Sequence, residues 1–285
     1  MRLLLAALLL ATPAVAETPF ERCQKSKDQL IERVGAENIS FKRPLTVEGG
    51  TCVQRGTRIT FPGEGTSLEV EAIRWGVNRT PGEASPFTLD ITATGITYAE
   101  LARNNFIQAR RSAEQSHLTV SIPIDPAERT ARIEADLDLF GEARIVLENT
   151  RVSLAPNAPL TADGISANMI FHSLSLRVEN ITAIRQIPPV AEKLKDLPDL
   201  TALKTLAPAF IEAAPDTALD RRSKTALNAL VQALPAPSGD LSLTIEAPNG
   251  FGAPDLALLM SEGFKSLEDL LAPFKISVSY PRLAL

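Results

Sequence analysis

The strict alternation of apolar and polar residues over much of positions 67–178 constrains the fold of this chain more than any other feature. A period of two residues puts the apolar side chains of a strand on one face and the polar ones on the other. The longest unbroken example is 130–139, and the pattern recurs at 87–94, 118–125 and 173–178. A parallel sheet covered on both faces would instead show nearly continuous apolar runs. The pattern predicts an antiparallel sheet with one dry face.

The rest of the chain supplies helices and further strands, so the expected fold class is α+β and β-rich. Strands of nine or more residues predict an elongated, curved antiparallel sheet. After Ile187 the apolar period becomes helical, with leucines at three-residue steps and prolines such as Pro208 as punctuation. Several short helices, the best at 217–234, are expected to pack on the sheet. The chain should end as strand, helix and strand at 241–245, 254–271 and 274–280.

Shorter signals complete the prediction. A helix is expected at 19–34, early strands at 38–47 and 53–61, and a short amphipathic helix within 98–115. Pro123 falls inside an alternating strand, and because proline has no N–H to donate, we expect it at a sheet edge or a bulge.

The first 16 residues have the pattern of a secretory signal peptide. Arg2 precedes an apolar run, and Ala14, Val15 and Ala16 form a small-residue cleavage site. We expect cleavage near Ala16 and a periplasmic or secreted mature protein. No later apolar run reaches the roughly 18 residues of a spanning helix, so no transmembrane anchor is expected after cleavage.

Cys23 and Cys52 are the only two cysteines. An exported chain meets an oxidising compartment, where an even pair normally closes. Their spacing is not that of a C-x-x-C redox or metal motif, so a structural disulfide is expected. The expected organisation is therefore a signal peptide at 1–16, a disulfide-linked helix and early strands at 17–62, the main sheet at 63–187, and helices with a strand-helix-strand ending at 188–285 that complete the same domain.

Composition excludes some partners. The net charge is −5, and the lysines and arginines are spread along the chain without a basic block that could follow a row of phosphates. Nucleic acid is therefore not expected as a partner. Aromatic residues make up only 5% of the chain, which argues against a stacking platform for bases or sugars.

No motif commits the chain to a reaction, a cofactor or a metal. His117 and His172 are the only histidines and lack the spacing of a metal site. Residues 164–168 approach the G-x-S-x-G nucleophile elbow but end in asparagine. The carboxylates of Glu134, Asp136 and Asp138 alternate with apolar positions, which favours a solvated strand face. Trp75, the sole tryptophan, is expected to pack in the core or at a sheet edge rather than to stack on a ligand.

The dry face of the sheet carries the most functional content, because something must shield it from water. Two alternatives are open: the helices cover it completely, or part of it forms a groove for an apolar ligand. The residues expected to line such a groove are Leu89, Ile91, Leu118, Val120, Ile122, Ile133, Leu137, Leu139, Leu174 and Leu176.

The strands at 131–140 and 142–154, together with the ending at 239–245, give the chain a general resemblance to the AsmA-like bacterial periplasmic β-groove proteins of the cell envelope. The chain differs from that group by its expected lack of a membrane anchor and by its helix-rich last third. The resemblance implies a role in lipid handling or envelope maintenance. From the secretory leader and the one-sided strands we expect a non-enzymatic exported protein whose elongated β-sheet binds lipid or another apolar ligand. The alternative is an adaptor for another envelope protein, without a ligand cavity.

Overall fold

The computed structural model describes residues 18–34, 38–60, 67–79, 87–98, 114, 116–125, 127–155, 168–185, 200–253, 255 and 267–281. The expected signal peptide, nearly all of the expected helix within 98–115, the elbow-like residues 164–167 and most of the helix expected at 254–271 lie outside these ranges. Those expectations stay predictions.

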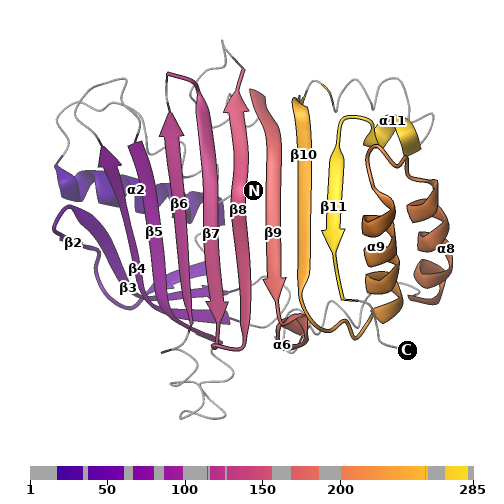
Figure 1. Cartoon of the computed structure of the whole chain (residues 1–285). Coiled ribbons are helices and arrows are strands. Elements are labelled where there is room, and N and C mark those ends of the chain that lie inside the picture. Colours follow the sequence, from indigo (N-terminus) through magenta and orange to yellow (C-terminus); the bar gives the residue numbers. More distant parts are fainter. Residues whose placement is uncertain are drawn as a thin grey trace. The chain divides into compact units, whose positions relative to one another are not determined.

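The fold is β-rich α+β, as the alternation predicts. Among the described residues, 11 strands form an open antiparallel sheet in the order β1-β3-β4-β5-β6-β7-β8-β9-β10-β11, with β2 paired to β3. Helices are few and occur mostly in the C-terminal region (Figure 1). The strands are β1 (Ile39–Phe41), β2 (Thr46–Glu48), β3 (Thr51–Thr60), β4 (Ser67–Arg79), β5 (Phe87–Tyr98), β6 (His117–Asp125), β7 (Thr130–Leu139), β8 (Ala143–Leu154), β9 (Met169–Glu179), β10 (Leu241–Gly252) and β11 (Lys275–Ser279). The helices are α2 (Pro19–Val34), α6 (Ile181–Arg185), α8 (Leu200–Ala213), α9 (Arg221–Ala233) and α11 (Leu267–Leu271).

The chain divides into two compact units. The described residues of the first are those up to Gly141, with Leu154 and Ala155. The second comprises Glu142–Ser153 and the described residues from Asn168 onward. The first unit therefore holds α2 and the strands from β1 to β7, and the second holds nearly all of β8, the strands β9 to β11 and the remaining helices.

In the first unit, the strand register aligns the apolar positions of neighbouring strands. Leu89 of β5 lies opposite Ile122 of β6, and Leu118 of β6 lies opposite Leu137 of β7. Burial along the first half of β7 alternates as the sequence does, with Ala131 and Ile133 buried between exposed residues. Cross-strand contacts of this kind are the unit of sheet stabilisation, so the period of two fixes both the faces and the register.

Two glycines explain why the alternation fades in β3, β4 and β5. Gly56 and Gly95 have φ of +64° and +67°, a left-handed conformation that L side chains rarely adopt. Glu71 of β4 lies between Gly56 on one neighbouring strand and Gly95 on the other. A Cβ on Gly95 would collide with the Glu71 side chain. Beyond this row the burial pattern changes phase, so that the adjacent residues Ile96 and Thr97 are both buried.

Pro123 lies on a central strand and at no bulge, so the expectation of a sheet edge or a bulge is wrong. Strand β6 pairs with β5 on one side and with β7 on the other. The paired positions of β6 with β7 run from His117 to Ser121 and resume at Ile124, so they skip the proline. The missing N–H is tolerated because the ladder is interrupted there without a change of register.

The strand expected at 38–47 is broken into β1 and β2. Pro44, which has no N–H, falls between them, and the amide of Gln54 donates to the carbonyl of Arg43 at 2.7 Å in the intervening bend. Both short strands still pair with β3. The bend also brings Leu45 into a buried cluster with the two cysteines.

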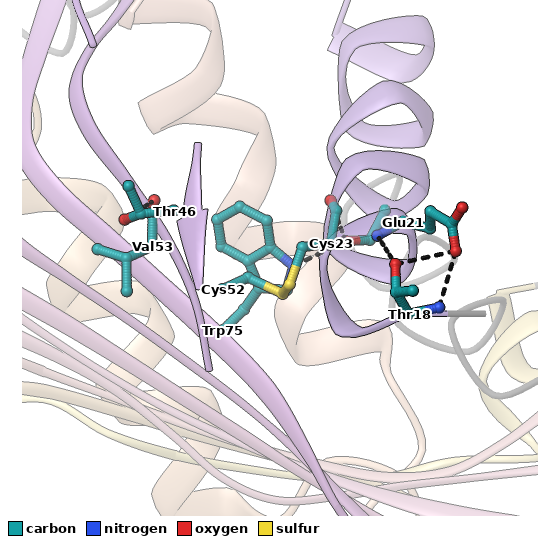
Figure 2. Close-up of a disulfide and its surroundings, with 8 residues drawn as sticks. Thr18, Glu21, Cys23, Thr46, Cys52, Val53 and Trp75 are labelled. Carbon is teal, nitrogen blue, oxygen red and sulfur yellow. Dashed lines mark hydrogen bonds between the residues drawn. A yellow bond between two sulfur atoms is a disulfide. The ribbon is translucent and has the colours of Figure 1, made fainter. Parts of the chain in front are cut away.

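The disulfide between Cys23 of α2 and Cys52 of β3 is present, as expected from the sequence (Figure 2). Trp75 of β4 packs against it, and the indole Nε1 donates to Ser26 Oγ of α2 at 2.8 Å. The helix begins with a capping box, in which Thr18 and Glu21 exchange hydrogen bonds (Figure 2). The disulfide, the indole and Leu45 therefore fix α2 to the strands. Trp75 is half-buried and packs against this cluster, which agrees with the expected core or edge placement.

In the second unit, α9 packs against the last two strands. Leu243 of β10 lies opposite Leu176 of β9 and Val278 of β11, and α9 covers this apolar surface with Ala226 and neighbouring residues. The edge of β11 that does not pair with β10 forms hydrogen bonds with residues 218 and 223. The carbonyl of Ala218 accepts from the N–H of Ile276 at 2.7 Å, and Ser223 Oγ accepts from the N–H of Val278 at 2.9 Å. These bonds protect an edge that could otherwise pair with another chain.

Helix α8 runs through Pro208, although the sequence analysis expected prolines to separate the helices. A proline inside a helix leaves the carbonyl four residues earlier without its usual donor. That carbonyl belongs to Lys204, and it accepts a hydrogen bond from Gln232 Nε2 of α9 at 3.0 Å. A tertiary contact thus compensates the missing backbone bond.

Candidate functional site

The ten residues expected to line a groove fall into two burial classes and two units. Leu89, Ile122, Ile133 and Leu139 are buried. The other six are half-buried, namely Ile91, Leu118, Val120, Leu137, Leu174 and Leu176. The structure brings those on β5, β6 and β7 into common rows in the first unit, whereas Leu174 and Leu176 belong to the second unit. A ligand groove along these residues stays a prediction.

Among the described residues of the second unit, the large apolar side chains that are exposed lie on α8. Leu203, Leu206 and Phe210 occupy positions i, i+3 and i+7, which share one face of a helix. Their exposed fractions are 38%, 56% and 62%, and no residue of α8 is buried. We call these three residues the α8 apolar face.

Helix α8 lies beside α9 (Figure 1). Side chains of α9 form hydrogen bonds with α8. Gln232 Nε2 donates to the carbonyl of Lys204, and Asn228 Nδ2 donates to Glu212 Oε1 at 3.1 Å. Ile211 of α8 is half-buried. The usual arrangement is therefore inverted, because α8 meets its neighbour through polar bonds while its largest apolar side chains point to solvent.

A buried lysine fastens the C-terminal end of α8. Lys224 of α9 is 6% exposed, and its ammonium group donates to Asp216 Oδ1 at 2.6 Å and to the carbonyl of Glu212 at 3.2 Å. The last carbonyls of a helix have no intrahelical donor, so a cation is favoured at this end. A buried charge needs such partners. The orientation of α8 relative to α9 is therefore specified by the hydrogen bonds that Lys224, Asn228 and Gln232 donate to α8.

The first turn of α9 is capped by Asp220. Its side chain Oδ1 accepts from the N–H of Ser223 at 2.7 Å. This hydrogen bond lowers the pKa of the Asp220 carboxyl below its ordinary value, and the charge of Arg222 lowers it further. The cap fixes the first turn of α9. Lys224, which holds the C-terminal end of α8, lies next to this turn.

The two histidines belong to different units. His117 is exposed at the start of β6, whereas His172 of β9 is hydrogen-bonded to Ser153 of β8, with 2.7 Å between Nε2 and Oγ. A nucleophilic site needs such a pair together with an orienting group and oxyanion donors. Within the described part of the chain, no carboxylate is hydrogen-bonded to the His172 ring. The pair links the neighbouring strands β8 and β9.

The carboxylates at 134, 136 and 138 lie along one face of β7. Glu134 is exposed and its Oε1 lies 4.0 Å from a guanidinium nitrogen of Arg132, and Asp138 accepts from the N–H of Gly141 at 3.0 Å.

Across the described ranges, no group of three or more histidine, cysteine, aspartate or glutamate residues is arranged as metal ligands would be. None of the described helices has both the length and the apolar character needed to cross a membrane.

Comparison with known proteins assigns no family to the chain. Its sequence matches no family model, and no curated protein matches it.

Sequence reasoning missed the α8 apolar face. The three-residue spacing of Leu200, Leu203 and Leu206 was a visible signal for an apolar helix stripe. We expected that stripe to cover the sheet, because helices normally turn their apolar face to the core. Nothing in the local sequence shows that Gln232, Asn228 and Lys224 would hold the opposite face of α8 instead.

Proposed function

We propose that this protein is an exported, non-enzymatic component of the cell envelope that binds lipid or another apolar ligand. The observation that carries the proposal is the α8 apolar face. Exposed apolar area favours a nonpolar partner by about 25 cal/mol per Å² removed from water. A contiguous exposed apolar patch commonly marks a membrane, ligand or protein contact.

Two further features support an extracytoplasmic location. The Cys23–Cys52 disulfide is a bond that persists in oxidising compartments and is rare in the cytosol. The first 16 residues have the composition of a secretory leader. The resemblance to AsmA-like envelope proteins agrees with a role in lipid handling or envelope maintenance.

Native mass spectrometry of the oxidised protein after gentle extraction tests the proposal. The expected spectrum contains complexes heavier than the polypeptide by the mass of a lipid, and organic extraction should release that lipid for identification. Protein that stays free of lipid, both as isolated and after incubation with envelope lipids, contradicts the proposal.

The second candidate is an adaptor whose α8 apolar face docks on another envelope protein. The polar bonds that hold α8 in place favour this alternative as well, because a fixed helix face is a common recognition element. Crosslinking in cells distinguishes the two candidates. A discrete crosslinked protein that persists after lipid removal supports the adaptor, whereas its loss with the lipid supports lipid binding.

A further inference from the structure

A pocket of about 620 Å³ lies between the start of α9 and the end of β11, within the second unit. The described residues that line it are Arg221, Arg222, Thr225, Ala226, Val278, Ser279 and Tyr280. Its volume is in the range of small-molecule sites, which is about 300–1,000 Å³. It lies at the N-terminal end of α9, close to Lys224.

The rim of this pocket is cationic. Arg221 and Arg222 are exposed, and among the described residues no carboxylate oxygen lies within 4.0 Å of either guanidinium, although the charge of Arg222 also acts on the neighbouring Asp220. No acidic residue is among the described lining residues, although the whole chain carries a net charge of −5. A guanidinium presents several N–H donors in a plane and suits the oxygens of a phosphate group.

The floor of the pocket is apolar and fixed. Ala226, Val278 and Tyr280 are each buried, at 7%, 5% and 7% exposure. The Tyr280 hydroxyl accepts a hydrogen bond from the N–H of Ser238 at 3.0 Å, which holds the ring in place. An anion carried on an apolar body would meet the arginines with its charge and the floor with its apolar part.

We propose that this pocket binds a phosphate group, held by the side chains of Arg221 and Arg222, with the headgroup of an anionic phospholipid as its source. The choice of a lipid as the source rests on the proposed function. The site itself rests on the pocket and on the two exposed arginines that line it. It does not rely on the helix end, because Asp220 already accepts from the N–H of Ser223.

The location also fits an amphiphile. Glu212 follows Phe210 of the α8 apolar face by two residues, and its carbonyl accepts from Lys224, which is one turn beyond Arg221. Lys224 therefore links the C-terminal end of α8, which follows Phe210, to the first turn of α9, which lines the pocket. A lipid could place its headgroup in the pocket and its acyl chains along α8.

Binding of the full oxidised chain to vesicles tests the inference, with phosphatidylcholine vesicles compared with vesicles that also contain phosphatidylglycerol. We expect tighter binding to the anionic vesicles and a loss of about tenfold or more in the variant R221Q/R222Q. The matched control is R132Q/R177Q, which removes the same number of exposed cations from strands β7 and β9. It should bind as the wild type does.

Inorganic phosphate, followed by NMR of the wild-type protein, supplies the second arm and needs no variant to fold. Shifts confined to the amides of residues 221–226 and 278–280 support the site. If they occur without vesicle binding, the phosphate group comes from a soluble molecule, and the lipid function fails while the site stands. The inference is overturned if neither ligand binds there, or if R132Q/R177Q loses as much binding as R221Q/R222Q.

Discussion

Reduction of the Cys23–Cys52 disulfide should lower the free energy of unfolding of the first unit by about 3.6 kcal/mol. The two cysteines are 29 residues apart in sequence. In the chain-entropy description, opening a loop of this size returns about 12 cal/mol/K to the unfolded chain, which gives that figure at 25 °C. Because both residues belong to the first unit, the second should keep its stability.

Urea denaturation of the oxidised and the reduced protein measures this difference. Trp75 packs against the disulfide and is the only tryptophan, so its fluorescence reports on the first unit alone. The same protein with and without reductant avoids any change of side-chain volume. A decrease below about 1 kcal/mol would refute the loop argument. An equal loss in circular dichroism of the second unit's helices would contradict the assignment of the effect to the first unit.

Three other predictions follow from burial and capping. Leu89→Ala should cost about 2–5 kcal/mol of unfolding free energy, because Leu89 has 0% exposure. Leu206→Ala, at 56% exposure, should change it by no more than about 0.5 kcal/mol, and equal effects in chemical denaturation would contradict the burial pattern. The pKa of Asp220 is lowered in the folded state, so its stabilising effect is present above the ordinary value of 3.8 and is lost as the pH falls through the folded pKa. Asp220→Asn keeps the cap but should remove this pH dependence, whereas Asp220→Ala should also destabilise α9 at neutral pH, as thermal melts between pH 2 and pH 7 can show.

The two-residue alternation of apolar and polar side chains predicted the strands whose formation depends on local sequence. Residues 130–139 alternate without a break and form β7, and the helix expected at 19–34 has the bounds of α2. The disulfide was predicted from the two cysteines and from the expectation that the chain is exported. The strand at 38–47 failed because Pro44 interrupts the backbone pairing.

Tertiary contacts decided the features that the sequence could not reveal. Pro208 was expected to end a helix, but Gln232, 24 positions further along, supplies the missing donor for the Lys204 carbonyl. The apolar stripe of α8 was visible in the sequence, whereas its direction depends on the bonds from α9. The pocket joins Arg221 to Ser279, which are far apart in the chain, and no local motif announces such a pair.

The affinity of a fluorescent fatty acid for the wild type and for L206S/F210S tests the central claim most directly. Leu206 and Phe210 are 56% and 62% exposed, and complete burial of such a side chain contributes about 1.5–3 kcal/mol. If the ligand covers what is now exposed, the double variant should lose about 2 to 3.5 kcal/mol, or roughly 30- to 300-fold in affinity. Phe20→Ser is the matched control, because Phe20 is 51% exposed on α2 in the first unit. The account predicts a loss in L206S/F210S alone, and unchanged affinity in that variant, or an equal loss in Phe20→Ser, would contradict it.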